Sequence, residues 1–407
     1  MISIHEAIGL VKANTPQPTV MNAPLAQAVG RYLAEDLHAP EPSPRFTNSA
    51  MDGYAVRWED LSSLTPERPC ALTLIGESQA GIPFSGRVGR GEAIRISTGA
   101  MLPDGADTVI RLEDTQETGP TVFIRTAKRH GQDVRVRGEE FDTGALLLHR
   151  GTRIAAPQAA LLAAVGLEQV RVFAPCTIAL LVTGSELVAA GSTIAAHQIR
   201  DSNMIMLQTA VQEAGAHLTS CARITDDRQA TTAAIGTASA TIILCTGGVS
   251  VGRHDHVKEA ALENGFTPLF WRVRQKPGKP LYLARKGETL LFGLPGNPVS
   301  AFMCFTHYVR PLIGALSGLP FDWPIMEAVA GEELTNKGGR STMLRVRMHW
   351  EENGECLITS AEKQGSHMLS SLVNADGYII LESGHTITPG ERVEVYSYDF
   401  RQTPARR

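Results

Sequence analysis

The sequence predicts a multidomain α/β + β fold in which a three-layer α/β/α sheet domain is combined with two β-rich domains. The chain has 407 residues, which is too long for one ordinary hydrophobic core. Between residues 177 and 246, apolar strands alternate with helix patterns, as in a parallel sheet covered on both faces. On either side of this region, short strand patterns are separated by glycine and proline turns. We therefore expect a sheet domain, a small inserted β domain and a C-terminal domain that resembles a β-barrel.

Composition and charge indicate a soluble protein that binds its ligands locally. Hydrophobic residues make up 43% of the chain and charged residues 20%, and the formal net charge is -4. This charge predicts no nucleic-acid partner. The six cysteines stand singly without a C-x-x-C pair, which argues against a zinc site and a disulfide scaffold. We expect a cytoplasmic protein without a membrane contact, because the start lacks a signal-peptide pattern and no segment approaches the length of a membrane span.

The N-terminal part is expected to form a discontinuous linker domain with a β domain inserted into it. Residues 4–11 place apolar side chains at helical spacing. Prolines at positions 40, 42 and 44 then enforce an extended segment. Short strand patterns occupy residues 71–136, and a proline-started helix and a short strand follow them. The expected boundaries are 1–40 and 138–173 for the linker domain and 41–137 for the inserted β domain.

The α/β domain is expected over residues 174–324, and its loops carry the candidate site. In such sheets, ligands bind beyond the carboxyl ends of the strands. Three polar turns follow strands in this domain, with the sequences TGSE, TDD and TGGVSVGRHD. Strand patterns resume over residues 325–407, which we assign to the C-terminal β domain. We expect the three turns to meet at one edge of the sheet.

The stretch LCTGGVSVGRHD has the residues of a phosphate-binding turn. Gly247 and Gly248 allow a sharp turn whose N–H groups face an anion, and Ser250 adds a hydroxyl donor. Asp255 could hold a divalent cation that bridges phosphate oxygens. The alternative is a plain glycine turn before a helix N-cap, and this stretch alone does not decide between the two. The histidines beside Asp255 have no third soft ligand nearby, so we interpret them as loop residues.

Acidic residues at neighbouring strand ends favour a magnesium site. Glu186 follows the TG turn of one strand, and Asp226 and Asp227 follow the next strand along the chain. Either aspartate could instead cap the following helix. With Asp255 on the same rim, these like charges repel one another unless a cation lies between them. We therefore expect Mg²⁺ to be bound by residues from the set Glu186, Asp226, Asp227 and Asp255.

Two lysines and a proline-rich turn complete the predicted site. Lys276 and Lys279 flank a Pro-Gly turn, so both ammonium groups can face the crevice and bind phosphate or another oxyanion. A solvated basic turn is the alternative. The run GLPGNP directly precedes a helix, and a helix N-terminus attracts anions. Its candidate binding residues are Pro295, Asn297 and Ser300.

Six motifs, taken in order, resemble MoeA, the molybdopterin molybdenumtransferase family, which includes the E domain of gephyrin. They are NSAMDGYAV, STGAMLPDGADTVI, TGSEL, GGVSVGRHD, KPGKP and GLPGNPVSA, and the resemblance extends over essentially the whole chain. It implies an enzyme that uses Mg²⁺ to insert molybdate into adenylylated molybdopterin with release of AMP. It also implies a homodimer whose cleft lies between the sheet domain of one subunit and the inserted domain of the other. A transient contact with the molybdopterin adenylyltransferase is implied as well.

The resemblance assigns roles to individual residues. The implied catalytic residues are Asp52, Thr98, Glu186, Asp226 and Asp255, the first two on the face that opposes the sheet domain. The implied binding residues for pterin, phosphate or molybdate are Thr183, Gly184, Gly247, Gly248, Ser250, Gly252, Lys276, Lys279, Pro295, Asn297, Ser300, Arg340, Ser341 and Ser366. The chain departs from the family at Ser185 and Thr47, where aspartate is usual, and at the histidines flanking Asp255.

Two other functions stay open at this point. Related sheet domains transfer an adenylyl group, so the chain could be a molybdopterin adenylyltransferase. It could also be a scaffold that binds molybdopterin without catalysis, although the presence of all the candidate acids argues against that. The sequence does not decide between molybdate and tungstate.

Overall fold

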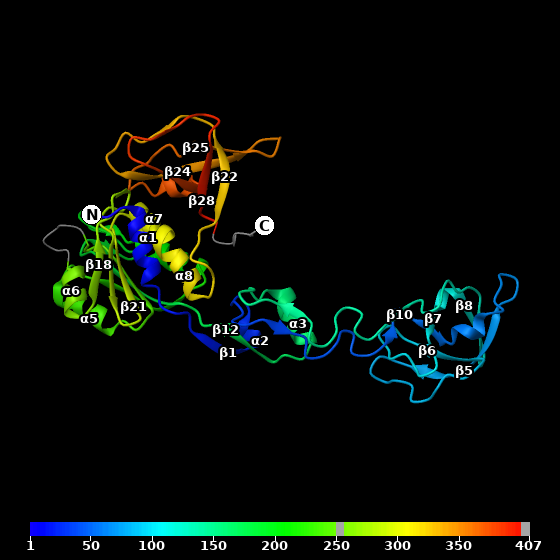
Figure 1. The fold of residues 1–407 in the computed structure, drawn as a ribbon. Coiled ribbons are helices and arrows are strands. Elements are labelled where there is room, and N and C mark those ends of the chain that lie inside the picture. Colours follow the sequence, from blue (N-terminus) through cyan, green and yellow to red (C-terminus); the bar gives the residue numbers. More distant parts are fainter. Residues whose placement is uncertain (250–255, 400–407) are drawn as a thin grey trace. The chain divides into compact units, whose positions relative to one another are not determined.

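The structure, a computed structural model, describes residues 1–249 and 256–399 and divides the chain into two compact units (Figure 1). Unit 1 consists of Met1–Ala23, Gly30–Ala34 and the chain from Arg171 onward. Unit 2 consists of Pro24–Val29 and Glu35–Val170. Strands β1 (Val20–Pro24) and β12 (Gln169–Phe173) pair with each other where the chain passes from one unit to the other. The four domain boundaries expected from the sequence stay predictions.

A mixed six-stranded sheet forms the centre of unit 1, in the order β16-β13-β17-β21-β20-β18. Its parallel strands are β16 (His217–Ile224), β13 (Thr177–Thr183), β17 (Ile242–Thr246) and β21 (Thr289–Leu294). Its antiparallel edge consists of β20 (Tyr282–Lys286) and β18 (Thr267–Trp271). The parallel arrangement expected from residues 177–246 is therefore correct, and β21 continues it, whereas the β20–β18 edge, for which no direction was predicted, is antiparallel. Lys286 pairs with Thr289 across a two-residue turn, and such a turn joins only antiparallel strands.

The sheet is covered on both faces, which confirms the three-layer prediction. Along β13, Ile178, Leu180 and Val182 enter one hydrophobic core, and Ala179 and Leu181 enter the other. The first core includes residues from α1 (Ile4–Ala13), α4 (Ser202–Glu213), α7 (Pro298–Cys304) and α8 (Arg310–Leu316). The second includes residues from α5 (Arg228–Thr237) and α6 (Val257–Glu263). Burial along β13 on both faces is what a central strand with two covered faces requires.

Helix α1 starts at a capping box and packs in the α/β core (Figure 1). Ser3 Oγ accepts a hydrogen bond from the Glu6 N–H at 3.1 Å, and Glu6 Oε2 accepts one from the Ser3 N–H at 2.7 Å. One face of the helix buries Ile4, Ala7 and Val11. The apolar spacing predicted from the sequence is thus explained by contact with the sheet domain.

A closed barrel of five strands lies in the described C-terminal part of the chain, as the sequence predicted. Its strands pair in the order β24 (Ser341–Trp350), β25 (Cys356–Ser360), β22 (Ile325–Ala330), β28 (Arg392–Ser397) and β26 (Gly377–Leu381), and β26 pairs back with β24. Val346, Ile358 and Val395 are in its hydrophobic core. Strand β19 (Gln275–Lys276) pairs in parallel with β24, so the start of the lysine turn is tied to the barrel.

Unit 2 is built around a second six-stranded sheet, which confirms the predicted β-rich region. Its strands, in order, are β7 (Thr108–Arg111), β4 (Gly53–Val56), β6 (Glu92–Ile96), β5 (Cys70–Ser78), β9 (Thr121–Ile124) and β8 (Thr115–Thr118). Tyr54 and Val56 enter one core and Ala55 the other. Helix α3 (Ala156–Ala164) contacts α2 (Leu25–Ala28) within the same unit.

Short pairings complete the two units. In unit 2 they are β2 (Leu37–His38) with β11 (Leu146–Leu148) and β3 (Asn48–Ser49) with β10 (Val134–Arg135). In unit 1 they are β14 (Leu187–Val188) with β15 (Ile199–Arg200) and β23 (Leu334–Thr335) with β27 (Thr386–Ile387). Further helical turns are η1 (Trp58–Leu61), η2 (Leu112–Asp114) and α9 (Ser370–Val373).

The helical segment Pro298–Leu316 is long and apolar enough to cross a membrane by length and composition alone. It consists of α7, the π-helical segment η3 (Phe305–Val309) and α8. The expectation that no segment approaches the length of a membrane span is therefore wrong. Most of this segment is buried against the sheet, which is the environment of a core helix.

His307 of η3 lies in an aromatic cluster that reaches the barrel. Its ring stacks on Trp323 with centroids 5.2 Å apart and meets Tyr378 and Tyr396 edge to face. Its Nδ1 lies 2.8 Å from Tyr378 Oη. Complete burial lowers the pKa of His307 to about 3, so the ring is neutral near physiological pH.

Acidification is expected to destabilise the fold through His307. Below pH 6.5 the unfolded chain binds a proton at this residue, whereas the folded chain binds one only near pH 3. The free energy of unfolding should therefore fall by up to about 1.4 kcal/mol per pH unit between these values. His307→Phe should flatten this dependence, while Tyr378→Phe should lower stability at every pH without changing the slope. Urea unfolding between pH 7.5 and 5 measures both, and equal slopes in wild type and His307→Phe would contradict the prediction.

Candidate active site

Buried polar side chains join the carboxyl ends of β13, β17 and β21. Thr183 Oγ1 donates to the carbonyl oxygen of Thr246 at 3.3 Å. Thr246 Oγ1 donates to the carbonyl oxygen of Pro295 at 3.1 Å. Asn203, in the first turn of α4, donates through Nδ2 to Thr246 Oγ1 at 3.0 Å and to the carbonyl oxygen of Gly296 at 2.8 Å. The strand ends therefore meet at one edge, as expected for turns that follow parallel strands.

Gly247 allows two of these strand ends to approach closely. Its φ is 85°, and a Cβ atom would lie 2.6 Å from Thr183 Oγ1 and 2.7 Å from the Thr183 carbonyl oxygen. Gly248 continues the turn with φ 65°. Only glycine combines this φ with so little space. The predicted site residues Ser250, Gly252 and Asp255 lie outside the described residues.

The structure separates the roles of the two adjacent aspartates. Asp226 Oδ2 accepts a hydrogen bond from the Ser185 N–H at 3.0 Å, and Ser185 Oγ accepts one from the Asp226 N–H at 3.1 Å. Asp227 Oδ1 accepts from the Ala230 N–H at 2.8 Å and caps helix α5. Asp226 is therefore the aspartate that is tied to the TG turn, and the serine side chain at this departure from the family supplies one of the two bonds, through its Oγ.

Glu186 lies beside this pair, in the exposed turn that follows β13. Its Oε2 would be 3.0 Å from a Cβ atom on Gly184, so the side chain folds back over the TG turn. Exposed carboxylate oxygens on neighbouring strand ends are the donors that Mg²⁺ prefers, and the donor chemistry fits that ion. Within residues 1–249 and 256–399, however, three or more acidic, histidine or cysteine side chains nowhere gather as a metal site. A complete magnesium set would thus need Asp255 or ligand oxygens.

The lysine turn packs on the first turn of α7. Lys276 and Lys279 are exposed, whereas the Pro277 and Gly278 between them are buried. A Cβ atom on Gly278 would lie 3.7 Å from the carbonyl oxygen of Ser300. Ser300 itself is buried in α7. Both lysines are therefore accessible to solvent, and their binding of an anion stays a prediction.

The barrel reaches the same edge through two hydrogen bonds. Arg340 Nη1 donates to the carbonyl oxygen of Gln275 at 3.1 Å. Asn297 Nδ2, in the GLPGNP turn, donates to Ser366 Oγ at 3.1 Å. Ser341, also named from the resemblance, donates instead to Glu382 Oε2 at 2.7 Å. Arg340 and Ser366 thus link the barrel to the lysine turn and to the GLPGNP turn.

Two buried polar residues near this edge were missed by the sequence analysis. Arg345 is fully buried, and its Nη2 donates to the carbonyl oxygens of Lys363 at 3.1 Å and Gly365 at 3.5 Å. Its Nε and Nη1 are buried without a hydrogen-bond partner, and burial lowers its pKa. Asn203 Oδ1 is likewise buried without a partner. The alternation of β24, which places Arg345 on the same face as buried Met343, was the signal that could have found the arginine.

Within unit 2, the structure brings Asp52 and Thr98 together. Asp52 Oδ1 accepts hydrogen bonds from the Thr98 N–H at 2.7 Å and from Thr98 Oγ1 at 3.1 Å. Both residues are exposed. The two residues that the resemblance placed on one face are therefore direct neighbours.

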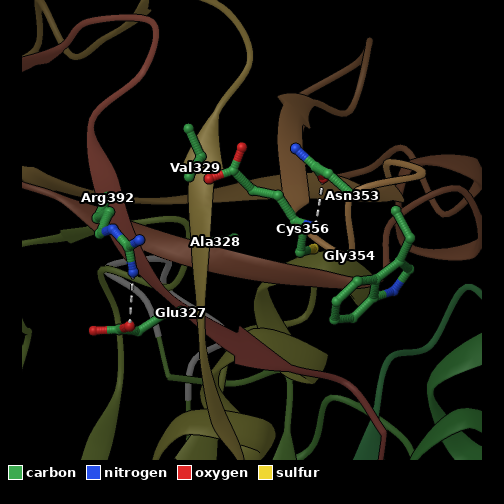
Figure 2. Close-up of a pocket in the computed structure, with 9 residues that line it drawn as sticks. Glu327, Ala328, Val329, Asn353, Gly354, Cys356 and Arg392 are labelled. Atoms are coloured by element: carbon green, nitrogen blue, oxygen red, sulfur yellow. Dashed lines mark hydrogen bonds and ion pairs between the residues drawn. The ribbon is translucent and has the colours of Figure 1, made fainter.

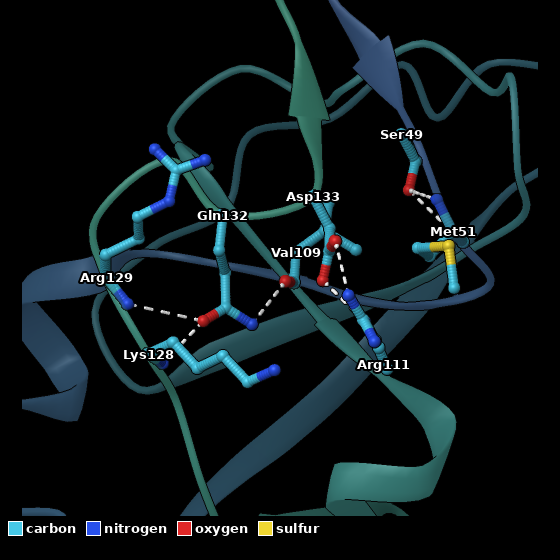
Figure 3. Close-up of polar contacts among 8 residues, drawn as sticks. All are labelled: Ser49, Met51, Val109, Arg111, Lys128, Arg129, Gln132 and Asp133. Atoms are coloured by element: carbon cyan, nitrogen blue, oxygen red, sulfur yellow. Dashed lines mark hydrogen bonds and ion pairs between the residues drawn. The ribbon is translucent and has the colours of Figure 1, made fainter.

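A polar cluster braces the loop that carries Asp52 (Figure 3). Arg111 donates from Nε and Nη2 to the two carboxylate oxygens of Asp133 at 2.9 and 3.1 Å. The Asp133 carbonyl oxygen accepts from the Ala50 N–H at 2.8 Å. Ser49 Oγ donates to the carbonyl oxygen of Met51 at 2.5 Å. Asp133 has φ 53°, a conformation that costs energy for a residue with a side chain and is held here by these bonds.

A pocket on the barrel, formed at β22, β25 and β28, carries a different set of residues (Figure 2). Glu327 and Arg392 form an exposed ion pair at 3.4 Å on one side of it, and Trp350 also lines it. It includes none of the predicted site residues. Exposed ion pairs of this kind contribute little to stability. The strand-end edge of the α/β sheet therefore remains the candidate active site.

The α/β sheet, the β-rich unit 2 and the C-terminal barrel define a multidomain protein of the α/β + β class. Three family models match successive parts of the chain. They are the MoeA N-terminal region (domain I and II) over residues 2–166, a probable molybdopterin binding domain over 179–315 and the MoeA C-terminal region (domain IV) over 327–398. The chain belongs to the MoeA family.

Relatives and solved structures are similar to the chain over nearly its whole length. A Haemophilus influenzae protein named molybdopterin molybdenumtransferase is 33% identical and covers 98% of this chain and 99% of that protein. A Nostoc protein of the same name is 34% identical over 90% of this chain and 86% of that protein. A crystal structure of a molybdopterin biosynthesis MoeA protein from Pyrococcus horikosii has a TM-score of 0.82 at 30% identity, covering 99% of this chain and 100% of that one.

Replacing Gly247 is expected to strain the site more than replacing a glycine of similar φ elsewhere. Gly191 has φ 84°, but a Cβ atom on it would have no other atom within 4 Å, so Gly191→Ala tests the backbone conformation alone. We expect Gly191→Ala to cost about 1 kcal/mol and Gly247→Ala at least about 2 kcal/mol more, because its Cβ meets the Thr183 backbone. Urea unfolding of both variants measures the difference. Equal losses would contradict the close approach of β13 and β17.

Proposed function

We propose that this chain is a molybdopterin molybdenumtransferase, which inserts molybdenum during molybdenum cofactor biosynthesis. The observation that carries the proposal is the joining of the glycine turn, the TG turn, the lysine turn and the barrel at one edge of unit 1. Full-length relatives of that name support it. We take the substrates to be adenylylated molybdopterin and molybdate, with AMP as a product, and the location to be the cytoplasm.

The proposed mechanism uses positioning and electrostatics rather than a covalent nucleophile. Backbone N–H groups of the turn that follows Gly247 would hold phosphate oxygens, because the N–H of Gly247 itself donates to the Leu294 carbonyl oxygen at 3.2 Å. Lys276 and Lys279 hold the molybdate oxyanion close to the pterin. Glu186 and Asp226, together with Asp255, would hold Mg²⁺. When bound, that ion supplies positive charge that polarises the phosphoanhydride.

We further propose that the active unit is a homodimer. Asp52 and Thr98 would then serve the cleft from the partner subunit, with the linker domain at the dimer interface. The exposed Asp52–Thr98 pair on a braced loop supports this role, because its groups are accessible and held in place. A transient contact with the molybdopterin adenylyltransferase would deliver the adenylylated substrate.

The two adjacent aspartates give a matched test of the acidic site. Asp226→Asn removes the charge tied to the TG turn, and we expect molybdenum insertion and AMP release to fall by about 100-fold or more. Asp227→Asn is the control, because asparagine caps a helix as well as aspartate does and its rate should stay within about twofold. Product formation at saturating Mg²⁺ measures both. Equal rates for the two variants would contradict the proposed role of Asp226.

Complementation between variants tests the cleft between subunits. Asp52→Ala and Asp226→Ala should each be inactive alone. If one subunit supplies Asp52 and the other Asp226, co-expression at equal amounts gives mixed dimers with one intact cleft, and about a quarter of wild-type activity should return. Recovery should be absent when the two substitutions are on the same chain, which is the control. No recovery in the mixed sample would contradict a cleft shared between subunits.

A further inference from the structure

Gln275, which directly precedes the lysine turn, is completely buried, and its side-chain amide is bonded on both sides. Its Nε2 donates to the carbonyl oxygen of Gly278 at 3.2 Å and to Cys304 Sγ at 3.4 Å. Its Oε1 accepts a hydrogen bond from Tyr308 Oη at 2.5 Å. Rotating the amide by a half-turn would place Oε1 against the Gly278 carbonyl oxygen, so these partners fix its orientation.

The turn itself is packed tightly onto this amide. Gly278 has φ 87°, and a Cβ atom there would lie 2.4 Å from Cys304 Sγ and 2.8 Å from Gln275 Nε2. The carbonyl group of Gly278 therefore points inward while the lysines on either side remain exposed. Burial raises the pKa of Cys304 to about 12, so the thiol is neutral and places no negative charge beneath the two ammonium groups.

Tyr308 is positioned by the π-helical segment η3. Tyr308 reaches Gln275, whereas the preceding residue, His307, contacts Tyr378 of the barrel. Tyr308 is fully buried, and burial raises its pKa well above the ordinary value, so it remains a hydroxyl donor. A π-helical turn changes the direction of the side chains that follow it and is frequent at functional sites. Here it directs adjacent residues to two different neighbours.

We propose that Gln275 and Tyr308 are positioning residues for the lysine turn. They hold the Gly278 carbonyl inward, so that Lys276 and Lys279 extend from a fixed backbone toward the bound oxyanion. The inference rests on the proposed function in one respect, namely that the two lysines bind molybdate. Binding is weakened when the segment that carries the contacts must first be ordered, so loss of this bracing acts on oxyanion affinity. Neither residue touches the substrate.

The test compares KM for molybdate in full-length Tyr308→Phe and Gln275→Met with wild type. Tyr308→Phe keeps the ring and removes the hydroxyl, and Gln275→Met keeps the side-chain length and removes the amide. We expect KM for molybdate to rise about tenfold in each, with kcat and KM for the pterin substrate changed by less than about threefold. The molybdate-dependent rise in Tm should shrink in parallel. Tyr378→Phe is the control, because it removes a buried hydroxyl beside His307 and leaves the Gln275 contacts intact.

A double-mutant cycle tests whether Tyr308 changes KM for molybdate through the two lysines. In a Lys276→Gln/Lys279→Gln background, Tyr308→Phe should raise KM for molybdate no further. An equal additional rise there, or an unchanged KM in Tyr308→Phe when the lysine variants are defective, overturns the inference and leaves the proposed function standing. An unchanged KM in the lysine variants themselves contradicts the lysine role in the proposed function and overturns the inference with it.

Discussion

The candidate site depends on the buried hydrogen bonds that hold three strand ends together. Thr246 accepts from Asn203 and donates to Pro295, so a single hydroxyl links a helix start, a strand end and the next turn. Leaving such a buried group without its partner costs about 1–3 kcal/mol, and these turns therefore cannot separate freely. Gly247 also holds two strand ends close together, because no side chain fits between its backbone and Thr183. The Gly247 N–H itself donates to the Leu294 carbonyl oxygen at 3.2 Å, so the start of this turn is also fixed to the end of β21.

Most of the fold was predictable because its periodicity is strong. The continuous apolar run at Thr177–Thr183 predicts a strand covered on both faces, and the mixed apolar and polar pattern of the barrel strands predicts strands covered on one face. The antiparallel edge of the sheet was not predicted, since its strands are as apolar as parallel ones and only the short turn after Lys286 distinguishes them. The helix that follows the GLPGNP turn was expected, but not that Pro298–Leu316 is long and apolar enough to match the length of a membrane span.

The site was predictable in outline but not in its contacts. Sequence order places Asp226 and Asp227 at one strand end, yet adjacent residues point in different directions, and only the structure shows that one bonds to Ser185 and the other caps α5. Arg345 could not be recognised as a site neighbour by charge, because an arginine in a strand is normally exposed. Its burial with two unbonded nitrogen atoms is a property of tertiary packing. The same holds for Gln275, whose role depends on a helix that follows it in the chain.

The distribution of charge explains why the groups around the lysine turn are packed in fixed positions in a protein with a formal net charge of -4. The chain as a whole does not attract anions, so attraction has to arise at short range from the two exposed lysines and from oriented N–H groups. The groups beneath the lysines contribute no opposing charge: Cys304 and Tyr308 are neutral by burial, and Gln275 is uncharged. The acids lie instead at the ends of β13 and β16, on the far side of the glycine turn in the order of the sheet. The lysine turn, with neutral packing beneath it, and the acids of the TG turn thus lie on different parts of the edge. Under the proposed function, this separation would let one site accept an oxyanion and a cation without either cancelling the other.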